Sequence, residues 1–196
     1  MSKRSQTIYL LLGAIALLGA GRTLPASAAS ATRSVAPMQA HATDPREPRP
    51  RDRSVLVRND TGIVAEIRTS NLDRAAYTVW WAIFNNPAFC ADLPCTSSDL
   101  PANGGDIRVE ASILYADGDV VGPNSKGRFI AGLSVGQTKD ALFGPGLLDP
   151  RGAEVHLLVR THGSEILEVL HEQVTTPGGG CPPNSCGDQQ FSVHLP

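Results

Sequence analysis

The sequence predicts an all-β protein, a Greek-key-like β-sandwich of about eight strands. Three observations lead to this fold class. Short runs of β-branched and aromatic residues recur along the chain, and Gly- and Pro-rich clusters separate them. In addition, no amphipathic stretch of about 12 or more residues follows a helical period. The expected β-sandwich domain covers residues 54–196, a length suited to a single domain.

Eight candidate strands share this β-rich composition. They are Val55–Arg58, Ile63–Thr69, Tyr77–Phe84, Ile107–Tyr115, Arg128–Leu133, Glu154–Thr161, Ile166–Val174 and Phe191–His194. The turn clusters that separate several of them are Asn59–Gly62, Ala102–Gly105, Ala116–Asp119 and Thr176–Gly180. Residues Thr138–Phe143 are expected to form at most a short helix, because the cluster Gly144–Gly146 would end it.

The strand Tyr77–Phe84 is the most informative, since it contains both tryptophans of the chain. Successive side chains of a strand point to opposite faces, so Trp81 shares one face with Tyr77, and Trp80 shares the other with Phe84. Both faces are apolar, which indicates a central strand that is covered on both sides. We expect both tryptophans to pack in the core; the alternative is a stacking platform for a sugar.

The first 28 residues have the layout of a secretory signal peptide. Lys3 and Arg4 supply positive charge, Ile8–Ala20 is apolar, and Ala26–Ala28 offers a cleavage site before Ala29. The apolar run has about 13 residues, short of the roughly 20 that cross a bilayer, so no membrane span is expected in the mature form. The protein is therefore expected to be secreted, periplasmic or part of the cell envelope.

Residues 29–53 are rich in Pro and Arg, and we expect a disordered linker there because large apolar side chains are too few to offset the entropy of ordering. Without the signal peptide the chain loses three basic residues and keeps 14 basic and 19 acidic ones, a net charge of −5. Such a surface gives no electrostatic reason to bind nucleic acid or anionic lipid, so no nucleic-acid partner is expected. The local exception is the arginine-rich run Arg46–Arg53.

The four cysteines form two pairs with the spacing C-x4-C, Cys90/Cys95 and Cys181/Cys186. An even number of cysteines in an exported chain indicates two disulfides. We favour pairing within each motif, because nearness in the sequence guarantees that the two thiols can meet. Pairing across the chain and a four-cysteine zinc site are the alternatives.

The five residues Gly132–Gly136 match the G-x-S-x-G pattern of serine hydrolases, with Ser134 as the candidate nucleophile of an esterase. That mechanism needs a long helix directly after the serine, and Gly144–Gly146 comes too soon to allow one. Asp117–Asp119 could supply oxygen ligands to calcium, but a hairpin turn is the expected structure there.

Four histidines form a candidate metal site: His156, His162, His171 and His194. His156 and His162 share a face of one predicted strand, but six residues separate them by about 20 Å, too far to bind the same ion. A metal would therefore need a subset of the four that converges from neighbouring strands. Surface or half-buried imidazoles are the simpler interpretation, and no cofactor is expected.

Three segments carry a resemblance to a known family. They are Tyr77–Cys90 (YTVWW, then FNNP and the cysteine), Gly144–Gly152 (GPGLLDPRG) and Glu154–Gly163 (EVH, then RTHG). Together they resemble a family of uncharacterised exported bacterial all-β proteins, and the likeness covers most of residues 55–194. The resemblance implies secretion and a β fold. A fainter similarity links residues 154–163 to chordin-type domains, which are β-sandwich-like, although Leu158 replaces the second histidine of their H-x-H pattern.

From these observations we expect an exported, non-catalytic binding or structural protein rather than an enzyme. The first alternative is a metal-binding protein that uses the four histidines, and the second is a serine esterase at Ser134. The sequence alone does not identify a ligand.

Overall fold

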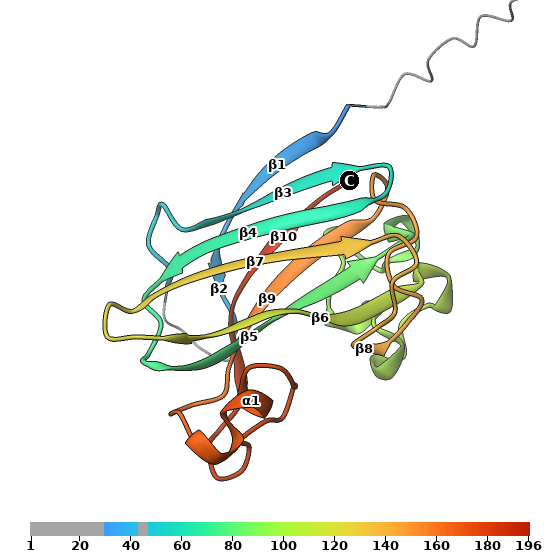
Figure 1. Cartoon of the computed structure of the whole chain (residues 1–196). Coiled ribbons are helices and arrows are strands. Elements are labelled where there is room, and N and C mark those ends of the chain that lie inside the picture. Colours follow the sequence, from blue (N-terminus) through green and yellow to red (C-terminus); the bar gives the residue numbers. More distant parts are fainter. Residues whose placement is uncertain (1–29, 43–46) are drawn as a thin grey trace, which may run out of the picture.

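The computed structural model describes residues 30–42 and 47–196, and it consists of two antiparallel sheets packed face to face (Figure 1). The strand orders are β1-β3-β4-β7 in the small sheet and β2-β10-β9-β5-β6-β8 in the large one. This arrangement confirms the predicted all-β sandwich. The predicted signal peptide, residues 1–28, lies outside the described residues, as do residue 29 and residues 43–46 of the predicted linker.

Ten strands and a few short helical turns make up the described chain. The small sheet contains β1 (Thr32–Pro37), β3 (Arg53–Asn59), β4 (Gly62–Ser70) and β7 (Lys126–Ser134). The large sheet contains β2 (Gln39–Ala40), β5 (Ala75–Phe84), β6 (Ala111–Val121), β8 (Ala141–Phe143), β9 (Glu154–Thr161) and β10 (Gly187–His194). The helical turns are η1 (Pro87–Phe89), η2 (Ser97–Asp99), η3 (Pro101–Asn103), η4 (Ile107–Val109), η5 (Leu167–Val169) and α1 (Leu170–Gln173). The order is Greek-key-like: β5 and β6 pair in the large sheet, and β7 then returns to the small sheet beside β4.

The prediction of disorder throughout residues 29–53 is wrong for β1 and β2. Strand β1 pairs antiparallel with β3, from Thr32 opposite Arg58 to Pro37 opposite Arg53, and β2 pairs with β10. Met38, between the two strands, is buried in the core. The short segment is therefore ordered because an edge of each sheet supplies its hydrogen bonds, a source of stability that its own composition does not reveal.

Two further predictions of local structure are wrong. The expected strand Ile166–Val174 forms η5 and α1, and the expected short helix at Thr138–Phe143 ends instead in β8. The period of a short apolar run is not enough to distinguish a strand from a helix. The structure that forms then depends on the parts of the chain that pack against the run. Residues Ile107–Val109 are likewise a helical turn, with the strand starting at Ala111.

The expected hairpin turn Ala116–Asp119 lies within β6, where the register shifts opposite Val79 and Trp80. Gly118 allows the carbonyl oxygen of Val174 to come close, because a Cβ there would lie 2.0 Å from that oxygen. The Asp117 carboxylate accepts a hydrogen bond of 2.8 Å from the backbone N–H of Ile130 in β7, the edge strand of the other sheet. These residues therefore join β6 to its neighbours and do not reverse the chain.

Strand β5 is buried along its whole length, as the apolar pattern on both of its faces predicts. Its inner face contributes Tyr77, Trp81 and other apolar side chains to the core between the sheets. On the outer face, Trp80 is 5% exposed and donates its indole N–H to Thr78. Both tryptophans are thus packing residues, and the expectation that they lie in the core is confirmed.

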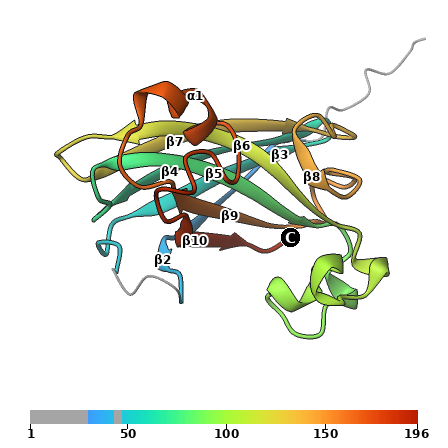
Figure 2. The same ribbon diagram turned by 90° about the horizontal axis from the view of Figure 1, so that it is seen from below.

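Two segments cover the outer face of β5 (Figures 1 and 2). The first, residues 87–110, carries η1 to η4 and the disulfide Cys90–Cys95. The second, residues 164–186, carries α1 and the disulfide Cys181–Cys186, and the hydroxyl of Tyr115 in β6 donates to its Val174 carbonyl. The predicted pairing within each C-x4-C motif is confirmed.

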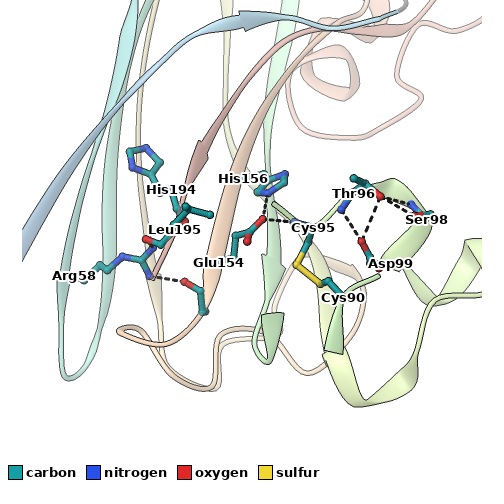
Figure 3. A network of polar contacts seen from close by, with 11 residues as sticks. Arg58, Cys90, Cys95, Thr96, Ser98, Asp99, Glu154, His156, His194 and Leu195 are labelled. Atoms are coloured by element: carbon teal, nitrogen blue, oxygen red, sulfur yellow. Dashed lines mark hydrogen bonds and ion pairs between the residues drawn. A yellow bond between two sulfur atoms is a disulfide. The ribbon is translucent and has the colours of Figure 1, made fainter. Parts of the chain in front are cut away.

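A buried arginine fastens one end of the sandwich. Arg58, the last inward-facing residue of β3, is 4% exposed and donates to four backbone carbonyls; Figure 3 shows it beside His194 and Leu195. The acceptors are Pro150 and Ala153, at 2.7 and 2.8 Å, and His194 and Leu195, both at 3.1 Å. One side chain therefore holds the chain before β9 and the end of β10 against the small sheet.

A chain of hydrogen bonds through His194 also joins the two sheets. The Ser54 hydroxyl donates to Ser192 at 2.7 Å and lies 2.7 Å from His194 Nε2, while the Ser34 hydroxyl lies 2.8 Å from His194 Nδ1. Because Ser54 already uses its proton on Ser192, it accepts from Nε2–H, and Nδ1 accepts from Ser34. All of these groups are satisfied when the imidazole is neutral, and burial, with the nearby positive charge of Arg58, lowers the pKa of His194 to about 4.

This pKa predicts that the protein loses stability in mild acid. An unfolded histidine has a pKa of about 6.5, so between pH 6.5 and 4 the unfolded chain binds a proton that the folded chain does not. The free energy of unfolding should fall as the pH is lowered through this window, with a contribution from His194 of about 3 kcal/mol.

Urea unfolding measured at intervals from pH 7.5 to 4 would test this prediction. The variant His194→Gln keeps hydrogen-bonding groups but does not titrate, so it should show a shallower pH dependence than the wild type. Parallel curves for the two proteins would contradict the assignment to His194.

Candidate functional site

A groove of about 610 Å³ lies on the outer face of the large sheet. Its floor is formed by side chains of β5, β6, β9 and β10: Ala82, Phe84, Ile113, His156, Leu158, Phe191 and Val193. One wall is formed by Asp92–Ser97 and Leu100 of the first covering segment, and the other by Gln39, His41 and Ala42. Figure 2 shows β2 at the edge of the large sheet beside β10, and the first covering segment at the lower right. The volume lies in the range of small-molecule sites, about 300–1,000 Å³.

The two-residue period of the strands places this floor on one face. His156 lies opposite Ala82 of β5 and Val193 of β10, and Leu158 lies opposite Phe191. Cross-strand partners share a face, so the apolar side chains of three adjacent strands meet there. The first covering segment reaches only one end of the face, and the groove lies between this segment and Gln39, His41 and Ala42.

The disulfide loop forms a rigid wall. Cys95 is buried, and the Asp99 carboxylate accepts hydrogen bonds from the backbone N–H groups of Ala91 and Thr96, at 2.8 and 2.7 Å (Figure 3). Burial would raise the pKa of Asp99, but these hydrogen bonds outweigh it and lower the pKa below its usual value. The carboxylate therefore fixes both sides of the loop that the disulfide closes.

A buried Glu–His pair lies where the wall meets the floor. Glu154 Oε1 accepts from the backbone N–H of Cys95 at 2.7 Å and from His156 Nε2 at 2.6 Å (Figure 3). The His156 ring also packs against Phe84, with 5.0 Å between ring centroids. Among the described residues, Glu154 Oε2 is a buried oxygen without a hydrogen-bond partner. The carboxylate orients the imidazole and ties it to the wall.

This arrangement leaves one polar atom of the groove floor available to a ligand. His156 lines the groove and uses Nε2 for Glu154, whereas Nδ1 makes no hydrogen bond in the described part of the chain. With Nε2 as donor, Nδ1 of the neutral ring is a hydrogen-bond acceptor. The groove can therefore hold an apolar body by contact and orient it through a single hydroxyl or N–H group.

Sequence reasoning missed Glu154 and the groove. In the sequence, Glu154 is predicted only as the first residue of a strand, although a carboxylate two residues before His156 must share its face. That spacing was the available signal. The wall cannot be read from the strand pattern, because it depends on how residues 87–110 fold over the sheet.

The four histidines of the candidate metal site occupy different places. His156 faces the groove, whereas His194 faces the core from β10, and His171 belongs to α1. His162 is covered by the second segment, with Nε2 2.8 Å from Thr78 Oγ1 and Nδ1 2.9 Å from the Gly179 carbonyl. Burial lowers the pKa of His162 below the usual value.

No three of these histidines come together in the part of the chain that the structure describes. The groups of three or more potential metal ligands there are His162 with Cys181 and Cys186, and Asp99 with Cys90 and Cys95. Both groups contain a disulfide, so their sulfurs are not thiolates that could bind an ion. The geometry thus gives no support to a site built from the predicted set.

Ser134 ends β7, as the G-x-S-x-G pattern requires of the strand. However, Val135 and Gly136 continue into a turn that returns toward Leu147, and the next element is the short strand β8. Within residues 30–42 and 47–196, Ser134 is not hydrogen-bonded to an imidazole. The strand–turn–helix geometry of a hydrolase nucleophile is therefore not formed around this residue.

No family model matches the chain, and the searches of curated proteins and of solved structures found no similar protein. The resemblance to exported bacterial all-β proteins and to chordin-type domains therefore stays a prediction. Among the described residues, no helix is long and apolar enough to span a membrane.

The Glu154 contacts predict a large loss of stability in the variant Glu154→Ala. Removing the carboxylate leaves the buried N–H groups of Cys95 and His156 without an acceptor, which should lower the free energy of unfolding by about 3 kcal/mol. Denaturant unfolding at neutral pH measures this effect. The matched control is Glu168→Ala on the exposed surface, expected to change stability by less than about 0.5 kcal/mol. Equal, small losses for the two variants would show that Glu154 does not anchor the wall.

Proposed function

We propose that the protein is an exported, non-catalytic binding protein whose groove takes a small ligand with an apolar body and one hydrogen-bond donor. The observation that carries the proposal is the combination of an apolar floor with the free Nδ1 of His156. Pockets of this kind, mostly apolar with a few placed polar groups, are typical of small-molecule binding.

The apolar floor argues that the ligand body is hydrocarbon-like. Phe84, Leu158, Phe191 and Val193 contact the groove from adjacent strands, and Leu93, 68% exposed, stands in the wall. Covering these side chains removes apolar surface from water, which is favourable by roughly 25 cal/mol per Å² before the costs of association. A strongly charged molecule would lose hydration here without gaining a counter-charge from the floor.

The hydrogen-bonding state of His156 argues for a hydroxyl group on the ligand. Glu154 holds the ring by Nε2, so a ligand hydroxyl can donate to Nδ1 without disturbing the Glu–His pair. The buried Glu154 and the disulfide wall fix this acceptor before a ligand arrives, which reduces the entropy cost of binding.

Export is supported by two independent features. The N-terminal sequence has the layout of a signal peptide, and both cysteine pairs form disulfides, which persist in oxidising compartments. A binding protein outside the cytoplasm would keep the disulfide wall of its groove intact.

Binding of the uncharged, polarity-sensitive dye Nile red tests the groove. The wild type should give a saturable fluorescence increase with one site per chain. The variant Val193→Trp places an indole in the groove and should weaken binding at least tenfold, because the floor is no longer accessible. The matched control Val64→Trp makes the same change at a half-exposed position of the other sheet and should bind within twofold of the wild type.

Competition against the dye then tests the polar contact. 1-Decanol should displace Nile red at a lower concentration than decyl methyl ether, which keeps the oxygen but lacks the donor hydrogen. Equal competition by the two compounds would contradict a role for His156 Nδ1. Absence of saturable dye binding, or an equal loss in both tryptophan variants, would contradict the proposed groove.

A further inference from the structure

A second, strongly charged groove lies at the opposite layer of the sandwich, where β4 ends and β7 begins (at the left in Figure 1). Its volume is about 1,050 Å³, and its lining comes from three separate parts of the sequence. These parts are residues 49–52 before β3, residues 68–70 of β4, and Asn124 with residues 126–128 of β7. The groove thus combines half of the arginine-rich run 46–53 with basic residues far along the chain.

Three arginines form a row across the outer face of the small sheet beside this groove. Arg53 of β3 lies directly opposite Arg68 of β4, which lies opposite Arg128 of β7. Neighbouring strands are about 4.8 Å apart, so the row spans about 10 Å. Like charges placed directly opposite each other destabilise a sheet. Nothing in the packing of the core requires this arrangement, because Arg68 and Arg128 are 60% and 63% exposed.

One carboxylate orients two of these arginines. Glu66 Oε1 accepts from Nε of Arg68 and from Nε of Arg128, both at 2.8 Å, and these bonds lower the pKa of Glu66. Each guanidinium keeps N–H groups that are free to meet an anion. Glu66 therefore holds the pair in position but does not neutralise it.

The loop before β3 adds two more cations in a fixed place. Asp52 accepts from the backbone N–H of Arg49 at 2.8 Å and from the Ser70 hydroxyl at 2.5 Å, which attaches the loop to the end of β4. Among the described residues, Arg49, Arg51 and Lys126 take part in no ion pair. Five basic side chains thus surround the groove, and Asp52 is the acidic residue in its lining.

We infer that this groove binds short anions that carry two or more phosphate or sulfate groups. Guanidinium groups match the tetrahedral oxyanions of phosphate and sulfate through paired hydrogen bonds, and several of them within about 10 Å favour a ligand with several charges. The net charge of −5 outside the signal peptide argues for a short ligand, because a long polyanion would extend onto an acidic surface. This inference is independent of the apolar groove.

Isothermal titration of the mature protein with sodium tripolyphosphate tests the inference. At low ionic strength we expect one site per chain, and 0.5 M sodium chloride should weaken binding at least tenfold. The double variant Arg51→Ala/Lys126→Ala should also bind at least tenfold more weakly. The control Arg33→Ala/Lys139→Ala removes the same charge from exposed positions outside the groove and should bind within twofold of the wild type.

A parallel titration with sucrose octasulfate distinguishes sulfate from phosphate ligands. Tighter binding than that of tripolyphosphate identifies sulfate as the preferred group, and weaker binding identifies phosphate. Failure to bind either compound would overturn the inference, and so would an equal loss in the two double variants. Tighter binding of a 30-nucleotide single strand of DNA than of tripolyphosphate would also overturn it, in favour of a nucleic-acid surface. The variant Val193→Trp should bind tripolyphosphate like the wild type, which separates this test from that of the apolar groove.

Discussion

The double burial of β5 is the constraint on which the rest of the structure depends. All ten of its residues are buried, so each face needs its own cover. The small sheet covers the inner face. The outer face lies on a sheet that has no second sheet against it, and two irregular segments, residues 87–110 and 164–186, cover its ends instead. Each is closed by a short-range disulfide, which compensates for the small apolar surface that such a segment can bury by itself.

The apolar groove follows from this way of covering the sheet. The segments are anchored at the ends of the outer face, by Glu154 on one side and by Tyr115 and His162 on the other. Beside the first segment, Leu158 of β9 and Phe191 and Val193 of β10 stay uncovered and line the groove. Buried hydrogen bonds hold the two sheets together on the inner side. Arg58 and His194 connect the sheets at defined points, which fixes the register in which they pack.

The sequence predicted the sandwich, both disulfides and the central strand, because these depend on local pattern: alternation, turn residues and cysteine spacing. The predictions from the sequence were wrong where contacts with residues far along the chain determine the local structure. Strand β1 is ordered by pairing with β3, and Gly118 continues a strand because it pairs with Thr78 of β5. The basic groove shows the same limit, since Arg49, Arg68 and Lys126 are scattered along the chain. The register of β4 and β7 brings Arg68 near Lys126, and the bond from Ser70 to Asp52 attaches the loop that carries Arg49. Glu154 could have been noticed from its spacing to His156.

The bond from Asp117 to the edge of β7 has a consequence for how copies of the protein meet. The segment Phe129–Leu133 is apolar and β-prone, and an edge strand of that kind is a template for intermolecular strand pairing and aggregation. The Asp117 carboxylate already occupies the N–H of Ile130 in this segment. An incoming strand would have to displace a charged group and place its own carbonyl beside it. The Asp117 side chain of the opposite sheet therefore makes strand pairing along this part of the edge less favourable.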